Sequence, residues 1–507
     1  MPDLLGIDLG TSSVKVVLIS EDGHISGIGS AEYPIFHPQS GFAEQEPKDW
    51  WQAVVFAVRQ ALAFDNGNVQ IAAIGLDGQM HGTVLLGQDG HPLYPAVIWP
   101  AQRTERQVRE ITELVGAERL IEITGSPIAT GFQAATVRWF QQERPEIWTQ
   151  TRFVLLPKDY LRWRLTGEHA SDPSDACSTL LLEALTRDWS PELLELLQID
   201  PRVLPPVQPS NVIAGSLQPA AAAELGLPSG IPVITGAGDT ASSVLGAGVT
   251  QPDTLLLNIS TGGQLVQPVY NLQLDHAGRI HTFCSAIEPG PGRAGWYKLG
   301  GILAAGLALR WLRDNLFALQ GQDAYQRMTT WAEQVPPGAD GLLFLPHLVG
   351  ERTPYMNPNA RGMFLGLALA HGQSHLVRAV LEGVGLAFYQ AYSAMTESGT
   401  PPERIVLAGG GARSSLWRQI MADIFDLPVK RSQVVEQSAV GAALLAGAGI
   451  GRFDASDQAL IWSEYDPPIE PLQENHTRYL ELCTRFQDAY IKHQDDFKSD
   501  APPSNVS

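Results

Sequence analysis

One pattern occurs twice in the chain: an apolar strand, a turn of small polar residues, and a second apolar strand. The first copy is GIDLGTSSVKVVLIS at residues 6–20, and the second is TLLLNISTGGQLVQPV at residues 254–269. Aliphatic and β-branched residues flank each turn, which predicts two β-hairpins. Because the copies lie half a chain apart, they predict two similar α/β lobes that face each other across a cleft. Ligands of α/β folds usually bind in such clefts.

The two turns combine glycine with serine and threonine. Such a turn exposes backbone N–H groups and hydroxyls on one side without bulk, which suits a phosphate group. Asp8, which precedes the first turn, would repel phosphate but can bind Mg²⁺, which would bridge it to the phosphates. The alternative is that both turns are only favourable hairpin turns. The first turn contains Gly10, Thr11, Ser12 and Ser13 after Asp8 and Leu9, and the second contains Ser260, Thr261, Gly262 and Gly263.

Two other glycine-rich segments suggest roles at the same site. In GAGDTASS, Asp239 follows a predicted strand and begins a predicted helix. There it could take the proton of an attacking hydroxyl, as in kinases, or simply cap the helix. In LAGGGARSSLW, Gly409, Gly410 and Gly411 could let a purine approach the backbone, or could form only a tight turn. By contrast, GPGRAG at 290–295 contains a proline between two predicted strands, which predicts a hairpin loop rather than a dinucleotide site.

Hydrophobic periodicity predicts the remaining elements. A proline at the entry of the helix near residue 47 fits the first turn of a helix. The last predicted helix begins at about Asn475. The other main predictions are a strand at 71–78 and helices at 300–316, 374–395, 414–425 and 438–449.

The length of 507 residues predicts two domains, at 1–246 and 247–490, followed by a flexible tail at 491–507 that ends in SDAPPSNVS. The net charge of −20 argues against nucleic acid or anionic membranes as partners. No basic leader and no long apolar run occurs, and the three cysteines form no CxxC motif. These features predict a soluble cytoplasmic protein with reduced thiols.

The motifs together resemble one family. GIDLGTSSVK, GAGDTA, STGG and AGGGARSSLWRQIMADI are similar to segments of the FGGY carbohydrate kinases, which belong to the actin-like ATPase superfamily. GMFLGLALAHGQSHLVRAVLE, residues 362–382, fits the C-terminal signature of that family. The resemblance extends from about residue 3 to about residue 490. It implies an α/β fold of two actin- or ribonuclease H-like lobes facing each other across a nucleotide- and sugar-binding cleft.

The resemblance also implies roles for particular residues. Asp239 matches the catalytic base, and Asp8 with Asp239 matches the Mg²⁺ site. Met80 and His81, with Gln79 beside them, match the sugar-contacting segment. Lys15 would be a neighbour of the first phosphate turn. The residues that match the ATP site are Gly10, Thr11, Ser12, Thr261, Gly262, Gly410, Gly411 and Arg413.

Within the family, LDGQMHGTVLL, LLPKDYLRWRLTGEHASDPSDA and FLPHLVGERTPYMNP are similar to xylulokinases. This implies ATP-dependent phosphorylation of the terminal hydroxyl of a ketopentose, with D-xylulose first. Ribulose, a pentitol or glycerol are alternatives, and a non-catalytic actin-like ATPase is a more distant one. The implied partners are a sugar and ATP, and homodimerisation is left open.

Two segments depart from the pattern of the family. WPAQR at 99–103 stands where many xylulokinases have W-N-D-x-R, and STGG at 260–263 stands where G-T-S-G is common. The first change replaces a polar pair and predicts the loss of local hydrogen bonds. The second keeps small polar residues but moves a hydroxyl. Both changes bear on which sugar is used, and neither removes Asp239.

Overall fold

The computed structural model describes residues 2–65, 70–397 and 399–498. Two sheets form its centre, and each is built around one copy of the repeated hairpin. The strands of the first sheet are, in spatial order, β11 (Ile213–Ser216), β12 (Pro232–Ile234), β5 (Ile71–Gly78), β1 (Asp3–Leu9), β2 (Ser13–Ile19) and β3 (Ile25–Glu32), with β13 (Ala237–Gly238) also paired to β5. The strands of the second are β16 (His281–Cys284), β17 (Trp296–Ile302), β15 (Gly263–Val269), β14 (Thr254–Ile259), β20 (Arg404–Ala408) and β21 (Val429–Arg431).

The pairing within the two sheets follows one scheme. β1 and β2 form an antiparallel hairpin, and β5 joins β1 in parallel. β14 and β15 form the second hairpin, and β20 joins β14 in parallel. The repeated sequence pattern therefore corresponds to a repeated structural unit, and both predicted hairpins are confirmed. The short strand pairs are β4 (Glu44–Gln45) with β7 (Ala96–Val97), β6 (Val84–Leu86) with β8 (Phe153–Leu155), β9 (Leu182–Glu183) with β10 (Asp188–Trp189), and β18 (Leu343–Leu345) with β19 (Met363–Leu365).

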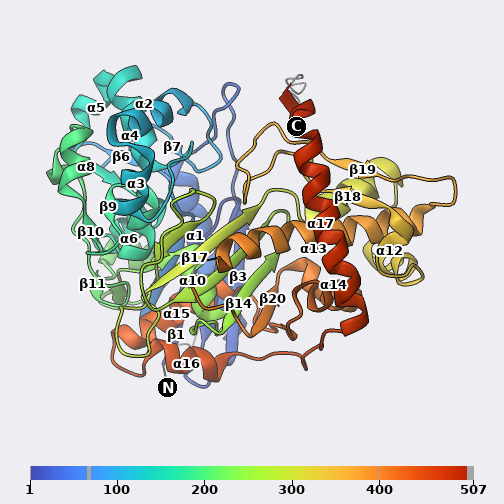
Figure 1. Ribbon diagram of the computed structural model, residues 1–507. Coiled ribbons are helices and arrows are strands. Elements are labelled where there is room, and N and C mark those ends of the chain that lie inside the picture. The colour runs from blue at the N-terminus through green and yellow to red at the C-terminus, as the bar shows by residue number, and fades with distance from the viewer. Residues whose placement is uncertain (1, 66–69, 398, 499–507) are drawn as a thin grey trace.

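Helices surround the two sheets. In Figure 1, α2, α4 and α5 lie on the side of the first sheet, and α12, α14 and α17 lie on the side of the second. The helices of the first half are α1 (Pro47–Leu62), α2 (Glu105–Val115), α3 (Ala117–Thr124), α4 (Gln133–Glu143), α5 (Pro145–Gln150), α6 (Pro157–Thr166), α7 (Pro173–Ala176), α8 (Pro191–Leu196), α9 (Pro219–Leu225) and α10 (Asp239–Gly246). Those of the second half are α11 (Gly306–Trp311), α12 (Ala324–Glu333), α13 (Gln373–Thr396), α14 (Ser415–Phe425), α15 (Gln437–Gly449), α16 (Ala455–Trp462) and α17 (Gln473–His493).

The first sheet is covered on both faces. Leu5 and Ile7 belong to the core that contains α1, whereas Leu4 belongs to the core that contains α15, as expected for alternating side chains of a strand. α15 can lie against β1 because Gly6 has no side chain: a Cβ there would meet the Ala439 carbonyl oxygen at 2.0 Å. A helix from the second half of the chain thus completes the sheet of the first half. The boundary near residue 246 stays a prediction.

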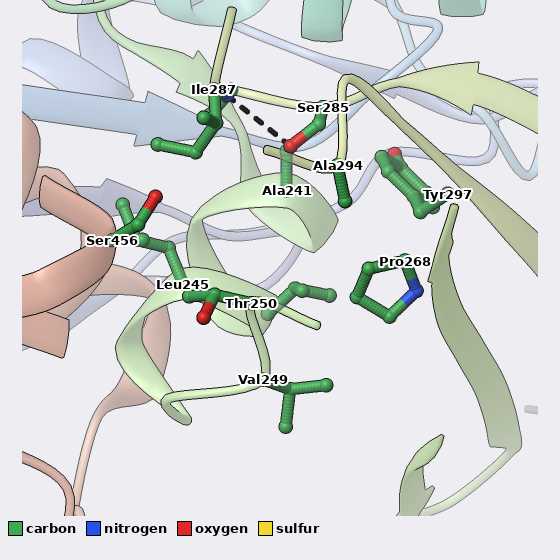
Figure 2. Close-up of a pocket in the computed structure, with 12 residues that line it drawn as sticks. Ala241, Leu245, Val249, Thr250, Pro268, Ser285, Ile287, Ala294, Tyr297 and Ser456 are labelled. Carbon is green, nitrogen blue, oxygen red and sulfur yellow. Dashed lines mark hydrogen bonds between the residues drawn. The ribbon is translucent and has the colours of Figure 1, made fainter. Parts of the chain in front are cut away.

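The two central helices, α10 and α15, pack closely on each other. A Cβ at Gly246 would meet the Gln437 carbonyl oxygen at 1.9 Å, and one at Gly441 would meet the Ser242 carbonyl oxygen at 2.0 Å. Against its other neighbours α10 leaves a small cavity of about 20 Å³, lined by Ala241, Leu245 and Tyr297 among others (Figure 2). Such a space is too small for a sugar or a nucleotide.

Most predicted elements are confirmed, and two predictions need correction. The helix predicted at 300–316 begins only at Gly306, because residues 296–302 form β17, which pairs with β15. Sheet pairing here overrides the local pattern. The tail predicted at 491–507 is structured in part, since α17 continues to His493 and a 3₁₀ turn covers Asp496–Lys498. SDAPPSNVS lies outside the described residues. GPGRAG lies in the loop that connects β16 to β17, as predicted. In the described part of the chain, the helices are too short or too polar to cross a membrane.

Candidate functional site

Three aspartates meet where neighbouring strands of the first sheet end. Asp8 on β1 and Asp77 on β5 are partners in the parallel register, so their side chains lie on the same face. Ala237 on β13 is in turn the partner of Asp77, and Asp239 follows two residues later as the first residue of α10. The sequence predicted Asp8 and Asp239 for one site, and the structure adds Asp77.

The pKa values of these three carboxyl groups depend on one another. Burial raises the pKa of Asp239 to about 7, and the negative charge of Asp8 adds to the effect. Burial also raises the pKa of Asp8 to about 6, although Asp77 and Lys15 lower it in part. Asp77 is fully buried, and burial, Asp8 and Asp239 raise its pKa well above the ordinary value. The Ser242 hydroxyl lowers the pKa of Asp77 in part, but burial and the two neighbouring carboxyl groups outweigh this effect.

The first polar turn connects β1 to β2, and its carbonyl groups are all held. The Gly10 carbonyl accepts from the Tyr33 hydroxyl, that of Thr11 accepts from Gln45 Nε2 at 2.7 Å, and that of Ser12 accepts from the Tyr33 N–H at 3.2 Å. Within the described residues, the N–H groups of Thr11 and Ser12 have no acceptor. The turn is therefore a fixed concavity with free donors, as an anion site requires.

The second turn, between β14 and β15, has the same arrangement. The Ser260 carbonyl accepts from the Gly306 N–H at 2.8 Å, and the Thr261 carbonyl accepts from the N–H groups of Ala305 and Leu307 at 3.1 and 2.9 Å. The start of α11 thus fixes the turn from behind. The N–H groups of Thr261 and Gly262 have no acceptor in the part of the chain that the structure describes. Among the residues that the structure describes, no hydrogen bond or ion pair joins this turn to the aspartates.

The triple-glycine segment after β20 lies against the end of β14. Gly409 has φ of 81°, and a Cβ there would meet the Ile259 carbonyl oxygen at 2.5 Å, so only glycine fits. A Cβ at Gly411 would meet the Ile259 side chain at 2.5 Å. At Gly410 a Cβ would meet nothing within 4 Å, so this position faces open space. Arg413 is exposed at the end of the following 3₁₀ turn.

The segment predicted to contact the sugar lies directly after β5. Met80 is buried beside Gly238, and its sulfur accepts a hydrogen bond of 3.9 Å from the Tyr297 hydroxyl. His81 has φ of 71°, and its Nδ1 lies 2.8 Å from the Ser178 carbonyl oxygen. Burial lowers the pKa of His81 to about 3, so the ring is neutral, with Nδ1 as the donor and Nε2 as an acceptor.

Gln79, the third predicted residue of this segment, is fully buried and acts on the first turn. Its Nε2 donates to Gln45 Oε1 at 2.8 Å, and Gln45 in turn donates to the Thr11 carbonyl. Gln79 therefore positions the first turn through Gln45.

A buried polar network supports the start of α10. The Gly238 N–H donates to Ser174 Oγ at 3.1 Å, and Ser174 donates to Asp172 through its N–H and its hydroxyl. Lys158 Nζ lies 3.1 Å from Asp172 Oδ1, and both side chains are fully buried. The network fixes the backbone immediately before Asp239. Sequence reasoning missed these residues because 64 positions separate Ser174 from Gly238.

The segment WPAQR retains two contacts that the sequence did not reveal. Trp99 Nε1 donates to Thr11 Oγ1 at 2.9 Å, which connects this segment to the first polar turn. Arg103 forms a buried ion pair of 2.6 Å with Glu44. Ala101, one of the two residues that depart from the family pattern, is fully buried among apolar side chains. The two departing residues therefore lie between two residues, Trp99 and Arg103, that make polar contacts in this chain.

The aspartates fit a divalent cation that phosphate oxygens help to hold. In the described residues, no group of three or more His, Cys, Asp or Glu side chains is arranged to hold a metal ion unaided. Mg²⁺ commonly binds through one or two carboxylates together with phosphates and water. Lys15, whose positive charge lowers the pKa of Asp8 in part, is already paired with Glu436 at 2.6 Å. The excess negative charge around Asp8 therefore suits a cation brought in with a nucleotide.

Comparison with known proteins agrees with this geometry. Residues 4–246 match the N-terminal domain of the FGGY family of carbohydrate kinases, and residues 268–450 match its C-terminal domain. The chain is 33% identical to a xylulose kinase of Bacillus subtilis (strain 168) over 497 residues, 98% of each chain. It is also 33% identical to a gluconokinase of the same organism, over 95% of this chain and 94% of the relative.

A solved structure is similar over nearly the whole length. The crystal structure of a xylulose kinase from Brucella ovis has a TM-score of 0.90 and 32% identity, covering 97% of this chain and 99% of that one. The chain therefore belongs to the FGGY family of carbohydrate kinases, whose two actin-like lobes use ATP as the phosphate donor.

Proposed function

We propose that the protein transfers the γ-phosphoryl group of ATP to the terminal hydroxyl of D-xylulose, forming D-xylulose 5-phosphate. The observation that carries the proposal is the position of Asp239 between the first phosphate turn and the Met80–His81 segment. On one side, the negative charge of Asp8 adds to the effect of burial in raising the pKa of Asp239. On the other side, the backbone before Asp239 packs against Met80.

In this proposal Asp239 is the catalytic base. Its carboxylate takes the proton from the terminal hydroxyl while the hydroxyl oxygen forms a bond to the γ-phosphorus. The bond between that phosphorus and the β-bridging oxygen breaks, and ADP leaves with the electron pair. Phosphoryl transfer depends mainly on positioning and charge stabilisation, so a single well-placed base suffices. The network of Ser174, Asp172 and Lys158 supplies the placement.

The two turns would hold the phosphates of ATP through the free N–H groups of Thr11, Ser12, Thr261 and Gly262. Gly410, Gly411 and Arg413 would face the adenosine. Asp8 and Asp239 would hold Mg²⁺, which offsets the negative charge that develops on the phosphates. The carbonyl groups behind each turn are already satisfied, so nucleotide binding requires no rearrangement of the turns.

D-Xylulose is the first candidate because of the xylulose kinases among the relatives. The similarity to a gluconokinase favours a sugar acid as a second candidate. A coupled assay that measures ADP release would compare D-xylulose with D-ribulose, gluconate, a pentitol and glycerol. We expect D-xylulose to have the highest kcat/KM by at least about tenfold, or roughly 1.4 kcal/mol of transition-state binding. A higher value for gluconate or glycerol would refute the choice of substrate.

A further inference from the structure

Four aromatic rings form a closed cluster behind the Met80–His81 segment. His81 stacks on Phe132 with a centroid separation of 4.0 Å, and Phe132 lies 5.9 Å from His281. His281 stacks on Phe283 at 5.3 Å, and Phe283 lies 6.1 Å from His81. We call His81, Phe132, His281 and Phe283 the ring cluster. Its first two members come from the first half of the chain, and the other two from β16.

His281 is the unusual member of the ring cluster. It is only 4% exposed, and neither of its ring nitrogens has a hydrogen-bond partner among the described residues. Buried polar groups nearly always have a hydrogen-bond partner, because a buried donor or acceptor without one destabilises the folded state. His81, by contrast, is half-buried and has its Nδ1 satisfied by Ser178.

Burial, helped by the positive charge of Arg352, keeps both imidazoles of the ring cluster neutral. Arg352 lies close enough to lower the pKa of both His81 and His281, in addition to the larger effect of burial. The guanidinium of Arg352 itself has no hydrogen bond or ion pair to any residue that the structure describes. A neutral imidazole offers one donor and one acceptor, which matches a hydroxyl or a hydroxyketone.

We propose that His281 is a specificity residue that hydrogen-bonds the end of the sugar remote from the phosphorylated hydroxyl. This inference rests on the proposed function, since it takes the reacting hydroxyl to lie at Asp239. From there the sugar extends past Met80 and His81 and reaches His281 at the buried end of the ring cluster. For a ketopentose, the groups at that end are the C1 hydroxyl and the C2 carbonyl. The unpaired nitrogens of His281 thereby gain partners when the substrate binds.

The test compares D-xylulose with its 1-deoxy analogue on the wild type and on four variants. The wild type should prefer D-xylulose in kcat/KM by at least about tenfold, because a site built to bind a hydroxyl rejects an analogue that lacks it. His281→Phe keeps the ring but removes both nitrogens. It should lower kcat/KM for D-xylulose by at least about tenfold and leave the 1-deoxy value within about threefold. At least one of His281→Asn and His281→Gln should retain the preference, since each keeps a donor and an acceptor.

His347→Phe is the matched control. His347 is 5% exposed and has an unpaired Nε2, but it packs against Tyr490 on α17. This variant should keep the wild-type preference for D-xylulose. The inference is wrong if His281→Phe also keeps the preference for D-xylulose, or if it lowers kcat/KM equally for both substrates. It is also wrong if neither His281→Asn nor His281→Gln retains the preference. Failure of the wild type to phosphorylate D-xylulose at all would instead refute the proposed function.

Discussion

Replacing Asp239 by asparagine should greatly slow turnover and, at the same time, stabilise the protein. The pKa of Asp239 lies at about 7 instead of 3.8, so the folded state resists ionisation of this side chain. Each pKa unit corresponds to about 1.4 kcal/mol, and the cost at pH 8 is therefore about 4 kcal/mol. The amide cannot ionise and avoids this cost. Without a base to accept the proton, kcat should fall by about 10²–10⁴-fold, with little change in the KM for ATP.

The pH dependence of the stability gain makes this prediction specific. Between pH 3.8 and about 7 the folded wild type keeps a proton on Asp239 that the unfolded chain has released. The free energy of unfolding therefore falls as pH rises through this window, and the loss is complete above pH 7. The advantage of Asp239→Asn should grow by about 2 kcal/mol between pH 5.5 and pH 8. Effects of the Asp-to-Asn change that do not depend on pH cancel when the stability gain at pH 8 is compared with the gain at pH 5.5.

Urea unfolding of both proteins, without nucleotide, at pH 5.5 and pH 8 measures the effect. Asp200→Asn is the control, because Asp200 is exposed and its hydrogen bonds to Arg202 lower its pKa to about 2. Asp200 is ionised in both states throughout this range, so its variant should show no gain that grows with pH. An advantage of Asp239→Asn that is independent of pH, or a variant less stable than the wild type at pH 8, would refute the reasoning about the three aspartates.

Three further predictions follow from the same site. The wild-type kcat/KM should fall about tenfold per pH unit below pH 7, because the free enzyme then holds Asp239 protonated; a level profile down to pH 5.5 would contradict this. Trp99→Phe should raise the KM for ATP about fivefold with kcat unchanged, since Thr11 loses one hydrogen bond; an unchanged KM would disprove it. Gly409→Ala should lower the free energy of unfolding by at least about 2 kcal/mol, whereas Gly410→Ala should leave stability intact and raise the KM for ATP. Equal thermal stability of the two alanine variants would argue against the packing described.

Local chemistry made much of this site predictable. The polar turns and Asp239 are marked by small residues between apolar runs, and such signals act over a few positions. Asp77 was missed because its role depends on β5 pairing with β1 in parallel, which brings Asp77 beside Asp8. Likewise, 88 positions separate Trp99 from Thr11. Such contacts arise from strand register and packing and leave no local pattern.

β17 shows the same limit for secondary structure. After the strand that follows GPGRAG, the sequence alone predicts a helix over residues 300–316. The hydrogen-bonding edge of β15 turns its first part into a strand. Local helix propensity therefore predicted the secondary structure of this segment correctly only where the segment does not pair with a neighbouring strand.

The placement of α15 on β1 and β5 has a consequence for how the chain is made. Translation delivers β5 about 360 residues before α15, which at roughly 5–20 residues per second is a delay of about 20–70 s. During this interval the face of the first sheet around Gly6 is not covered by α15, because that helix has not left the ribosome. A polypeptide that stopped after residue 246 would never cover that face, so we expect such a fragment to aggregate.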